Sequence, residues 1–479
     1  MTPAASAALA ETTPVATGPG DITDHLTALA DRLRPDLGEH GVLLAPAARY
    51  GGDRAVASAP DARFLVALPR NVAGVQATLR LAHETGTPVV PRGAGSGLSG
   101  GATPVDGAIV LGLERLTRIR EIDLRDEVAV VEAGVITADL SRELAPHGFF
   151  YAPDPASATF STLGGNIATN AGGLHCAKYG VTRESVLALD VVLADGTLLR
   201  TGHRSLKGVT GLDLTQLLIG SEGTLAVVVA ATVRIRPLPV ARQTLTARFP
   251  STAAAVEGVG AISLSPVRPA ATELLDAGSL EDIDESTGAG LAEGRSALLL
   301  IELDGYGIQE QTRDLSAVLR DAGADVQVIE DEAAAEHLWE LRRSGRGSGA
   351  GLARLGEDVA VPKSRLGEMY AELERLGAAH GIRTSAVAHA GDGNLHPSLS
   401  APVTAQDSAA PLPAPVRAAA DELVRGALAL GGTISGEHGI GTAKHGWLDL
   451  ELSPASRALQ RGLKSVFDPR NLLNPGKAL

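Results

Sequence analysis

The chain has 479 residues, of which 44% are hydrophobic and 20% charged, a composition typical of globular enzymes and unlike that of disordered chains. This length predicts two or more domains. The net charge of −14 argues against a general affinity for nucleic acids or anionic membranes. Cys176, the single cysteine, can neither form an internal disulfide nor hold an iron–sulfur cluster by itself.

The N-terminal segment 1–20 is small and apolar and lacks Lys and Arg. A secretory signal needs a positive start and a mitochondrial presequence needs arginines, so we expect a disordered tail here and a cytoplasmic protein. No run of eighteen apolar residues occurs in the sequence, and therefore no membrane span is expected.

Strand and helix patterns alternate through the first half of the chain. The opening helix is expected from about Asp21 to His40, and apolar residues at helical spacing predict a second helix over Val72–Glu84. The other elements expected here are strands over Phe64–Leu68, Thr87–Pro91, Ala108–Leu111, Val128–Glu132, Val186–Leu193, Thr197–Thr201 and Leu225–Arg236, and a helix over Thr137–His147 with Thr137 as its cap.

The second half also alternates, which suits an α+β cap over an active site. Its predicted elements are strands over Ala297–Leu303 and Asp325–Ile329 and helices over Gln309–Asp321 and Ala333–Arg342. Residues 401–415, rich in Ala and Pro, are expected to form a surface loop, and 467–477 an ordered coil after a helix. We therefore expect two domains, 40–240 and 241–479.

A glycine-rich loop, Pro91–Gly101, follows one of the predicted strands. Such a loop can turn several backbone N–H groups toward one point and bind phosphate oxygens. Gly95, Gly97 and Gly100 fit the G-x-G-x-x-G dinucleotide fingerprint, but that motif must be followed directly by a helix. Further glycines and a proline follow instead, so the Rossmann interpretation fails on context.

Two more small-residue segments lie downstream, Thr162–Gly173 and Gly220–Leu225. Three separated loops of this kind fit a long cofactor threaded between them better than a single phosphate or a set of surface turns.

Together these segments resemble a known family. Pro91–Gly101, Pro153–Ser157, Gly164–Gly173, Lys178–Gly180 and Gly220–Leu225 look like the FAD domain of the vanillyl-alcohol oxidase/PCMH superfamily. More narrowly, they resemble its D-lactate dehydrogenase, glycolate oxidase and D-2-hydroxyglutarate dehydrogenase branch. The resemblance implies an α+β fold with a PCMH-type FAD-binding domain, a ferredoxin-like cap and a C-terminal segment that returns to the FAD.

The resemblance also implies which residues bind FAD. No histidine lies inside the pyrophosphate loop, so noncovalent FAD is expected. The expected cofactor-binding residues are Pro91, Arg92, Gly93, Ala94, Gly95, Ser96, Gly97, Leu98, Pro155, Ser157, Gly164, Gly165, Asn166, Thr169, Asn170, Gly172, Gly173, Glu222, Gly223 and Val227, with Asn394 near flavin or substrate.

Two glycine-flanked stretches of the second half carry histidines and a carboxylate. His389 and His396 lie in the first, and Glu437 and His438 in the second. Two histidines and a carboxylate suit Zn²⁺ or Mn²⁺ with positions left open for substrate oxygens. The resemblance implies that His389, His396 and Glu437 bind a divalent metal and that His438 is the general base.

A substrate carboxylate is best matched by an arginine. Arg342, in Trp339–Arg342, resembles the Trp-x-x-Arg segment of the family and is our candidate. The hydroxyglutarate branch has a lysine just before the segment that begins at Glu357, whereas this chain has Gly356 there. That difference puts a longer diacid substrate in doubt.

Other basic residues are further candidates for contacts with substrate or cofactor. Arg346 and Arg354 are candidates to replace the missing lysine. Lys444 and Lys477 lie beside glycines and are candidates to touch cofactor or substrate, although Lys477 could equally be a mobile tail residue.

The predicted function is FAD-dependent oxidation of a small D-2-hydroxy acid, with lactate first and glycolate second. Electrons would pass to an external acceptor such as a quinone, a cytochrome or an electron-transfer flavoprotein. The sequence leaves open whether the protein forms a homodimer. The alternatives are a sugar or aldonolactone oxidase on the same fold, which would not need the histidine–glutamate set, an FAD-binding subunit of a partner-dependent complex, and a zinc hydrolase without flavin.

Overall fold

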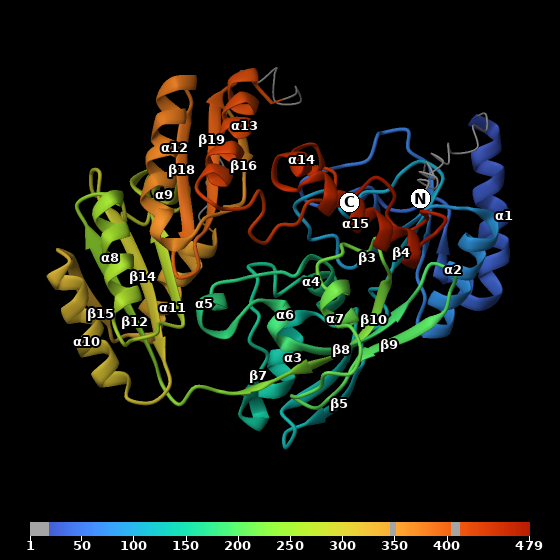
Figure 1. Ribbon diagram of the computed structural model, residues 1–479, viewed down its shortest axis with the longest axis horizontal. Coiled ribbons are helices and arrows are strands. Elements are labelled where there is room, and N and C mark those ends of the chain that lie inside the picture. The colour runs from blue at the N-terminus through green and yellow to red at the C-terminus, as the bar shows by residue number, and fades with distance from the viewer. Residues whose placement is uncertain (1–18, 345–350, 404–411) are drawn as a thin grey trace, which may run out of the picture.

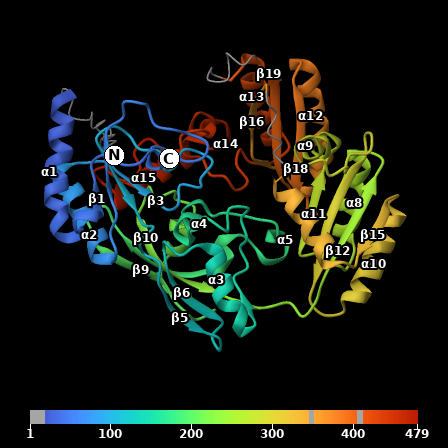
Figure 2. The same ribbon diagram turned by 180° about the vertical axis from the view of Figure 1, so that it is seen from behind.

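The computed structural model describes residues 19–344, 351–403 and 412–479. An N-terminal half, blue to green, and a yellow-to-orange cap lie side by side, and the red C-terminal segment returns to the N-terminal half (Figures 1 and 2). Residues 1–18 of the expected tail, part of the expected loop 401–415 and Arg346 lie outside the described residues, while the tail's last two residues begin the first helix.

The N-terminal half opens with a four-stranded sheet in the order β1-β2-β4-β3, in which β4 pairs in parallel with β2 and β3. Parallel strands need a crossover connection, and α2 supplies one between β2 and β3, which lie on either side of β4. The elements are α1 (Pro19–Leu37), β1 (Val42–Leu43), β2 (Phe64–Ala67), α2 (Val72–Thr85), β3 (Val89–Arg92) and β4 (Ala108–Gly112).

A second sheet of this half has five antiparallel strands in the order β5-β6-β10-β8-β9. Its strands are β5 (Ile119–Asp123), β6 (Val128–Glu132), β8 (Val186–Val192), β9 (Leu198–Gly202) and β10 (Val227–Arg234). Around it lie α3 (Thr137–Leu144), β7 (Phe149–Phe150), α4 (Leu163–Thr169), α5 (Cys176–Tyr179), α6 (Thr182–Ser185), α7 (Leu214–Leu218) and β11 (Arg236–Pro237).

The cap is built on an eight-stranded antiparallel sheet. Its first four strands lie in the order β15-β12-β14-β13, with α8 between β12 and β13 and α10 between β14 and β15, which is the ferredoxin-like arrangement expected. The sheet then continues through β18, β19 and β16. The strands are β12 (Arg242–Phe249), β13 (Ala271–Leu275), β14 (Ala297–Asp304), β15 (Asp325–Ile329), β16 (Leu352–Gly356), β17 (Val359–Ala360), β18 (Arg383–His389) and β19 (Asn394–Pro402).

Helices cover both faces of the cap sheet. The main core of the cap lies under α8 (Thr252–Leu264), α10 (Ile308–Asp321), α12 (Leu366–His380) and α13 (Ala414–Ala429). A second cluster on the opposite face includes α9 (Ala277–Thr287) and α11 (Glu332–Ser344). Leu174 of the N-terminal half joins that second cluster, so this face of the cap packs toward the N-terminal half.

The C-terminal segment completes the four-stranded sheet. After α14 (Leu448–Glu451) and α15 (Pro454–Phe467), Leu473 forms a parallel bridge with Val89 of β3. Lys477 is only 2% exposed and its Nζ donates to the carbonyl oxygens of Gly101 and Thr103, which rules out a mobile tail.

Expected and observed elements agree to within a few residues, with two differences. Thr137 is the first residue of α3 and its hydroxyl donates to Ser161 O, while Ile136 occupies the cap position. A strand predicted over Leu225–Arg236 is divided into β10 and β11. In the part of the chain that the structure describes, no helix is long and apolar enough to cross a bilayer.

Candidate functional site

A cavity of about 550 Å³ lies where the glycine loops meet the cap and the C-terminal segment. Its size falls within the range of about 300–1,000 Å³ usual for small-molecule sites. The cavity is lined by all the residues expected to bind FAD except Asn170 and Asn394, together with His389, His396, Glu437, His438 and Arg342.

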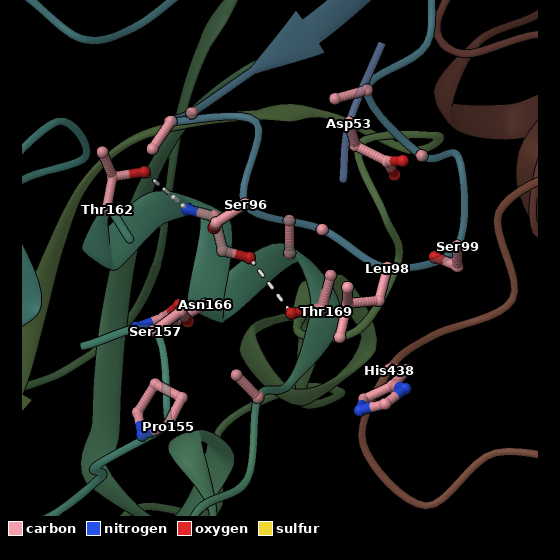
Figure 3. Close-up of a pocket in the computed structure, with 18 of the residues that line it drawn as sticks. Asp53, Ser96, Leu98, Ser99, Pro155, Ser157, Thr162, Asn166, Thr169 and His438 are labelled. Carbon is pink, nitrogen blue, oxygen red and sulfur yellow. Dashed lines mark hydrogen bonds between the residues drawn. The ribbon is translucent and has the colours of Figure 1, made fainter. Parts of the chain in front are cut away.

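The loop after β3 crosses α4 at very close range. Figure 3 shows Ser96 and Leu98 along that loop, Thr169 on α4, and His438 beyond Leu98. A Cβ added at Gly93 would lie 2.3 Å from Thr162 Oγ1, so only glycine allows this approach. The loops therefore form a cradle of backbone groups around the cavity, as a long phosphate-bearing cofactor requires.

Three side chains of metal-binding types, two histidines and one glutamate, converge at the cap end of the cavity. Glu437 Oε1 lies 3.3 Å from His396 Nε2 and 3.7 Å from His389 Nε2. One ligand atom from each of the three residues lies within 4.8 Å of the others. His389 lies on β18 and His396 on the paired strand β19. Their rings meet edge to face with centroids 5.0 Å apart.

A buried carboxylate, Glu273 of β13, lies behind this triad. Its Oε1 is 2.8 Å from His389 Nδ1, and its Oε2 accepts from Arg342 Nε at 2.7 Å. Burial alone would lower the pKa of His389, but the charge of Glu273 raises it well above its usual value. A carboxylate bonded to the far nitrogen of a histidine orients the ring, and this is typical of metal sites.

The other histidine of the triad has the opposite electrostatic environment. Burial lowers the pKa of His396 to about 4, although Glu437 acts against the shift. Its imidazole is therefore neutral near pH 7, which is the form that binds a metal. Burial raises the pKa of Glu437, but its contacts with both histidines outweigh burial and hold that pKa well below its usual range.

His438 stands next to the triad and partly open to the cavity. Its ring is stacked on that of His396, with centroids 5.2 Å apart and planes at 14°. Its side chain is 13% exposed, and its Nε2 lies 3.9 Å from Glu437 Oε1. The cavity thus brings together the possible metal ligands, the His438 imidazole and the glycine cradle.

Comparison with known proteins identifies the family. A family model for an FAD binding domain matches residues 64–202, and one for the C-terminal domain of FAD linked oxidases matches residues 238–478. This chain belongs to the FAD-linked oxidases. It is an FAD-dependent oxidoreductase, as the glycine loops and their resemblance led us to expect.

Relatives of this FAD-linked oxidase cover most of its length. Glycolate oxidase subunit GlcD of Bacillus subtilis is 40% identical over 428 residues, 88% of this chain and 89% of that protein. A D-lactate dehydrogenase of Archaeoglobus fulgidus is 34% identical over 427 residues, 87% of this chain and 91% of that protein. The solved structure of p-cresol methylhydroxylase has the same fold, with a TM-score of 0.77 at 17% identity, covering 95% of this chain and 97% of the other.

Two residues of this FAD-linked oxidase do not line the cavity as expected. Asn394 donates its amide to Asp358 Oδ1 at 2.7 Å and to Val359 O at 3.0 Å, because it is buried behind the His438 loop. Asn170 ends α4 in the left-handed conformation, and its side chain accepts from Arg183 N. Neither is among the described residues that line the cavity.

Several expected basic residues have structural partners instead of open positions. Arg92 lines the cavity, but its guanidinium donates to the carbonyl oxygens of Gly52 and Arg49. Lys444 is buried and donates to Asp358 O, and Arg354 forms an ion pair with Asp282. Arg342 lines the cavity while part of its guanidinium is held by Glu273.

Sequence analysis missed three residues at this site. Arg343 lines the cavity beside Arg342, Glu273 supports His389, and Asp358 holds the loop that carries His438. A signal was available for Glu273, since a lone carboxylate among otherwise uncharged residues needs a partner when it is buried. No local sequence pattern distinguishes the buried Asp358 from an aspartate on the protein surface.

Proposed function

We propose that this FAD-linked oxidase oxidises a small 2-hydroxy acid, lactate or glycolate, to the 2-oxo acid. The observation that carries the proposal is the convergence of His389, His396, Glu437 and His438 on the cavity formed by the glycine loops. The names of the relatives, a glycolate oxidase subunit and D-lactate dehydrogenases, support hydroxy-acid oxidation in general.

The residues present fit both groups that such a reaction needs. The glycine cradle fits FAD, which would supply the acceptor for the substrate hydride. His389, His396 and Glu437 would hold a divalent metal, Zn²⁺ or Mn²⁺, which would supply Lewis acidity toward the substrate oxygens. The Glu273 carboxylate bonded to His389 is a feature expected of such a metal site and is found here.

His438 would remove the proton of the substrate hydroxyl. It lines the same cavity as the glycine loops and the triad, so one substrate can reach all three. A hydroxyl is a very weak acid, and a positioned imidazole overcomes this by taking the proton as the hydride leaves. Base and hydride acceptor must be held together around one carbon for this to work.

Arg342 would bind the substrate carboxylate. It reaches the cavity from α11, and Glu273 holds both its Nε and its Nη2, so Nη1 is the nitrogen that would bind the carboxylate. Arg343 offers a second cation beside it, although Glu336 forms an ion pair with it at 2.8 Å. Electrons would leave the FAD for an external acceptor, a quinone, a cytochrome or an electron-transfer flavoprotein.

The test is anaerobic bleaching of the flavin absorbance by D-lactate, L-lactate, glycolate and D-2-hydroxyglutarate, before and after treatment with a chelator. We expect bleaching by D-lactate or glycolate, loss of bleaching with chelator, and its return when Zn²⁺ or Mn²⁺ is added. A yellow protein that none of these acids bleaches would contradict the proposal and favour a lactone oxidase or a partner-dependent subunit. Bleaching that survives complete metal removal would remove the metal from the proposal.

A further inference from the structure

Two buried carboxylates hold the short loop that carries His438. Asp358 Oδ2 accepts from the backbone N–H of Glu437 at 3.0 Å and of His438 at 2.9 Å. Glu222 Oε1 accepts from Ile440 N and its Oε2 from Gly441 N, both at 2.8 Å. Hydrogen bonds thus hold the backbone at Glu437 and His438 and again at Ile440 and Gly441, on both sides of the imidazole that faces the cavity.

The two carboxylates come from different halves of the molecule. Asp358 lies beside β17 in the cap, whereas Glu222 belongs to the Gly220–Leu225 turn of the N-terminal half, which lines the cavity. Glu222 and Ile440 are 218 positions apart in the chain. Glu222 was expected to bind the cofactor, and it does line the cavity, while each of its carboxylate oxygens accepts a backbone N–H from the loop that carries His438.

The backbone of Glu222 is itself firmly held. It adopts the left-handed conformation at φ 51°, which is unfavourable for a residue other than glycine, asparagine or aspartate. Its N–H donates to Ala168 O at 2.7 Å, and its carbonyl accepts from Asn474 Nδ2 at 2.7 Å. These contacts with α4 and the C-terminal segment aim the carboxylate at the His438 loop.

We propose that Glu222 is a positioning residue that ties the glycine cradle to the His438 loop, so that hydride acceptor and proton acceptor share one support. This inference rests on the proposed function, in which His438 is the base. Proton and hydride leave from adjacent atoms of the substrate, and a misplacement of about 1 Å can cost roughly 10²-fold in rate. Glu222 would therefore affect the chemical step without touching the substrate.

Glu222→Gln tests this role with little change in volume. An amide presents one oxygen and one NH₂ group, so one of the two backbone N–H groups would face a donor instead of an acceptor. The experiment measures flavin reduction in stopped flow at increasing hydroxy-acid concentration, per FAD bound. We expect the rate at saturation to fall about 10- to 100-fold, while the half-saturating substrate concentration and the FAD content change less than about twofold.

A matched control separates positioning from general stability. Glu132 is a buried carboxylate of the same half that binds Arg118 and is not among the described residues lining the cavity. Glu132→Gln should lower the melting temperature without slowing flavin reduction in the FAD-loaded enzyme. A Glu222→Gln enzyme that loses only stability or FAD, and reduces its remaining FAD at the normal rate, would overturn the proposal.

The double variant Glu222→Gln/His438→Ala distinguishes this inference from the function beneath it. If Glu222 acts through His438, the double variant should be no slower than His438→Ala alone, and losses that multiply would overturn the positioning role. If His438→Ala alone reduces flavin at the normal rate, the role of His438 in the proposed function is wrong, whatever the result for Glu222. Should Glu222→Gln not fold, Glu222→Asp gives the same test, because it keeps the charge but shortens the reach.

Discussion

The two cap histidines of the triad have opposite protonation tendencies because their buried neighbours differ. His389 lies against the Glu273 carboxylate, and His396 faces another histidine and Glu437. The family resemblance, rather than the motif alone, implied that His389 and His396 share one site. Neither predicted Glu273, since this carboxylate lies 116 positions from His389 and joins it only when β13 pairs with β18.

Replacing the supporting carboxylate should weaken the metal site. In Glu273→Gln the ring of His389 loses its charged partner, and removal of such a partner typically costs 10- to 100-fold in metal affinity. Metal content after dialysis against graded chelator would measure the loss. Glu336→Gln is the control, since Glu336 is an exposed carboxylate that pairs with Arg343. Equal metal affinity in both variants would separate Glu273 from the metal.

Replacing the proposed base should affect only the chemistry. His438→Ala should keep FAD and metal but lose about 10²–10⁴-fold in the rate of flavin reduction, the usual contribution of a general base. Stopped-flow reduction with the best substrate of the panel would measure it. His389→Ala provides the contrast, because it should lose the metal. Full activity of His438→Ala would remove the assigned role.

At the scale of elements, the short helix α5 (Cys176–Tyr179) joins the two halves. His175, just before it, lies 2.6 Å from Asp154 and 3.1 Å from Glu302 of the cap strand β14. Lys178 and Tyr179 both bond Asp304 at the end of that strand. The sequence marked Lys178–Gly180 by resemblance alone, and periodicity could not reveal that these residues contact the cap.

The contact of His175 makes stability depend on pH. Burial lowers the pKa of His175, but Asp154 and Glu302 outweigh it and raise the pKa to about 10 from an unfolded value of 6.5. A pKa raised on folding gives a contribution that is complete below pH 6.5 and is lost as pH rises toward 10. We expect melting temperature to fall between pH 7 and 10, by an amount reflecting a few kcal/mol.

The comparison of His175→Gln with wild type isolates that contribution. The variant should melt at a lower temperature at pH 7, and the gap between the two proteins should narrow as pH approaches 10. His147→Gln is the matched control, since His147 is exposed, and its melting temperature should follow wild type at every pH. A gap that stays constant from pH 7 to 10 would show that His175 is not charged in the folded protein.

At the scale of the whole molecule, the FAD cavity is assembled from segments far apart in the chain. Sequence patterns were sufficient for most strands of the two N-terminal sheets, which depend on local periodicity, but in the cap they predicted only β14, β15, α10 and α11 and missed β18 and β19, which carry the histidines. The family resemblance supplied the return of the C-terminal segment to the FAD half. Neither indicated that Lys477 would be buried against the glycine loop, because that contact depends on packing across the molecule.

Lys477 should therefore matter for FAD retention. Its Nζ donates to Gly101 O, Thr103 O and Asn474 Oδ1, and Lys477→Met leaves these buried acceptors without their donor. Such a loss costs roughly 1–3 kcal/mol. We expect a lower melting temperature and weaker FAD binding, measured by FAD release on dilution. Lys363→Met, at an exposed lysine, is the control, and equal FAD release in both variants would contradict the prediction.

The closure of the glycine loop by the end of the chain also fixes an order of events during biosynthesis. Asn474 bonds Gly101 O across 373 positions. At about 5–20 residues added per second, the ribosome needs roughly 20–75 s to make the residues between them. Throughout that interval the glycine loop lacks its contacts with the C-terminal segment. We therefore expect stable FAD binding only once the C-terminal segment has been made, and a chain truncated before Asn474 should retain FAD poorly.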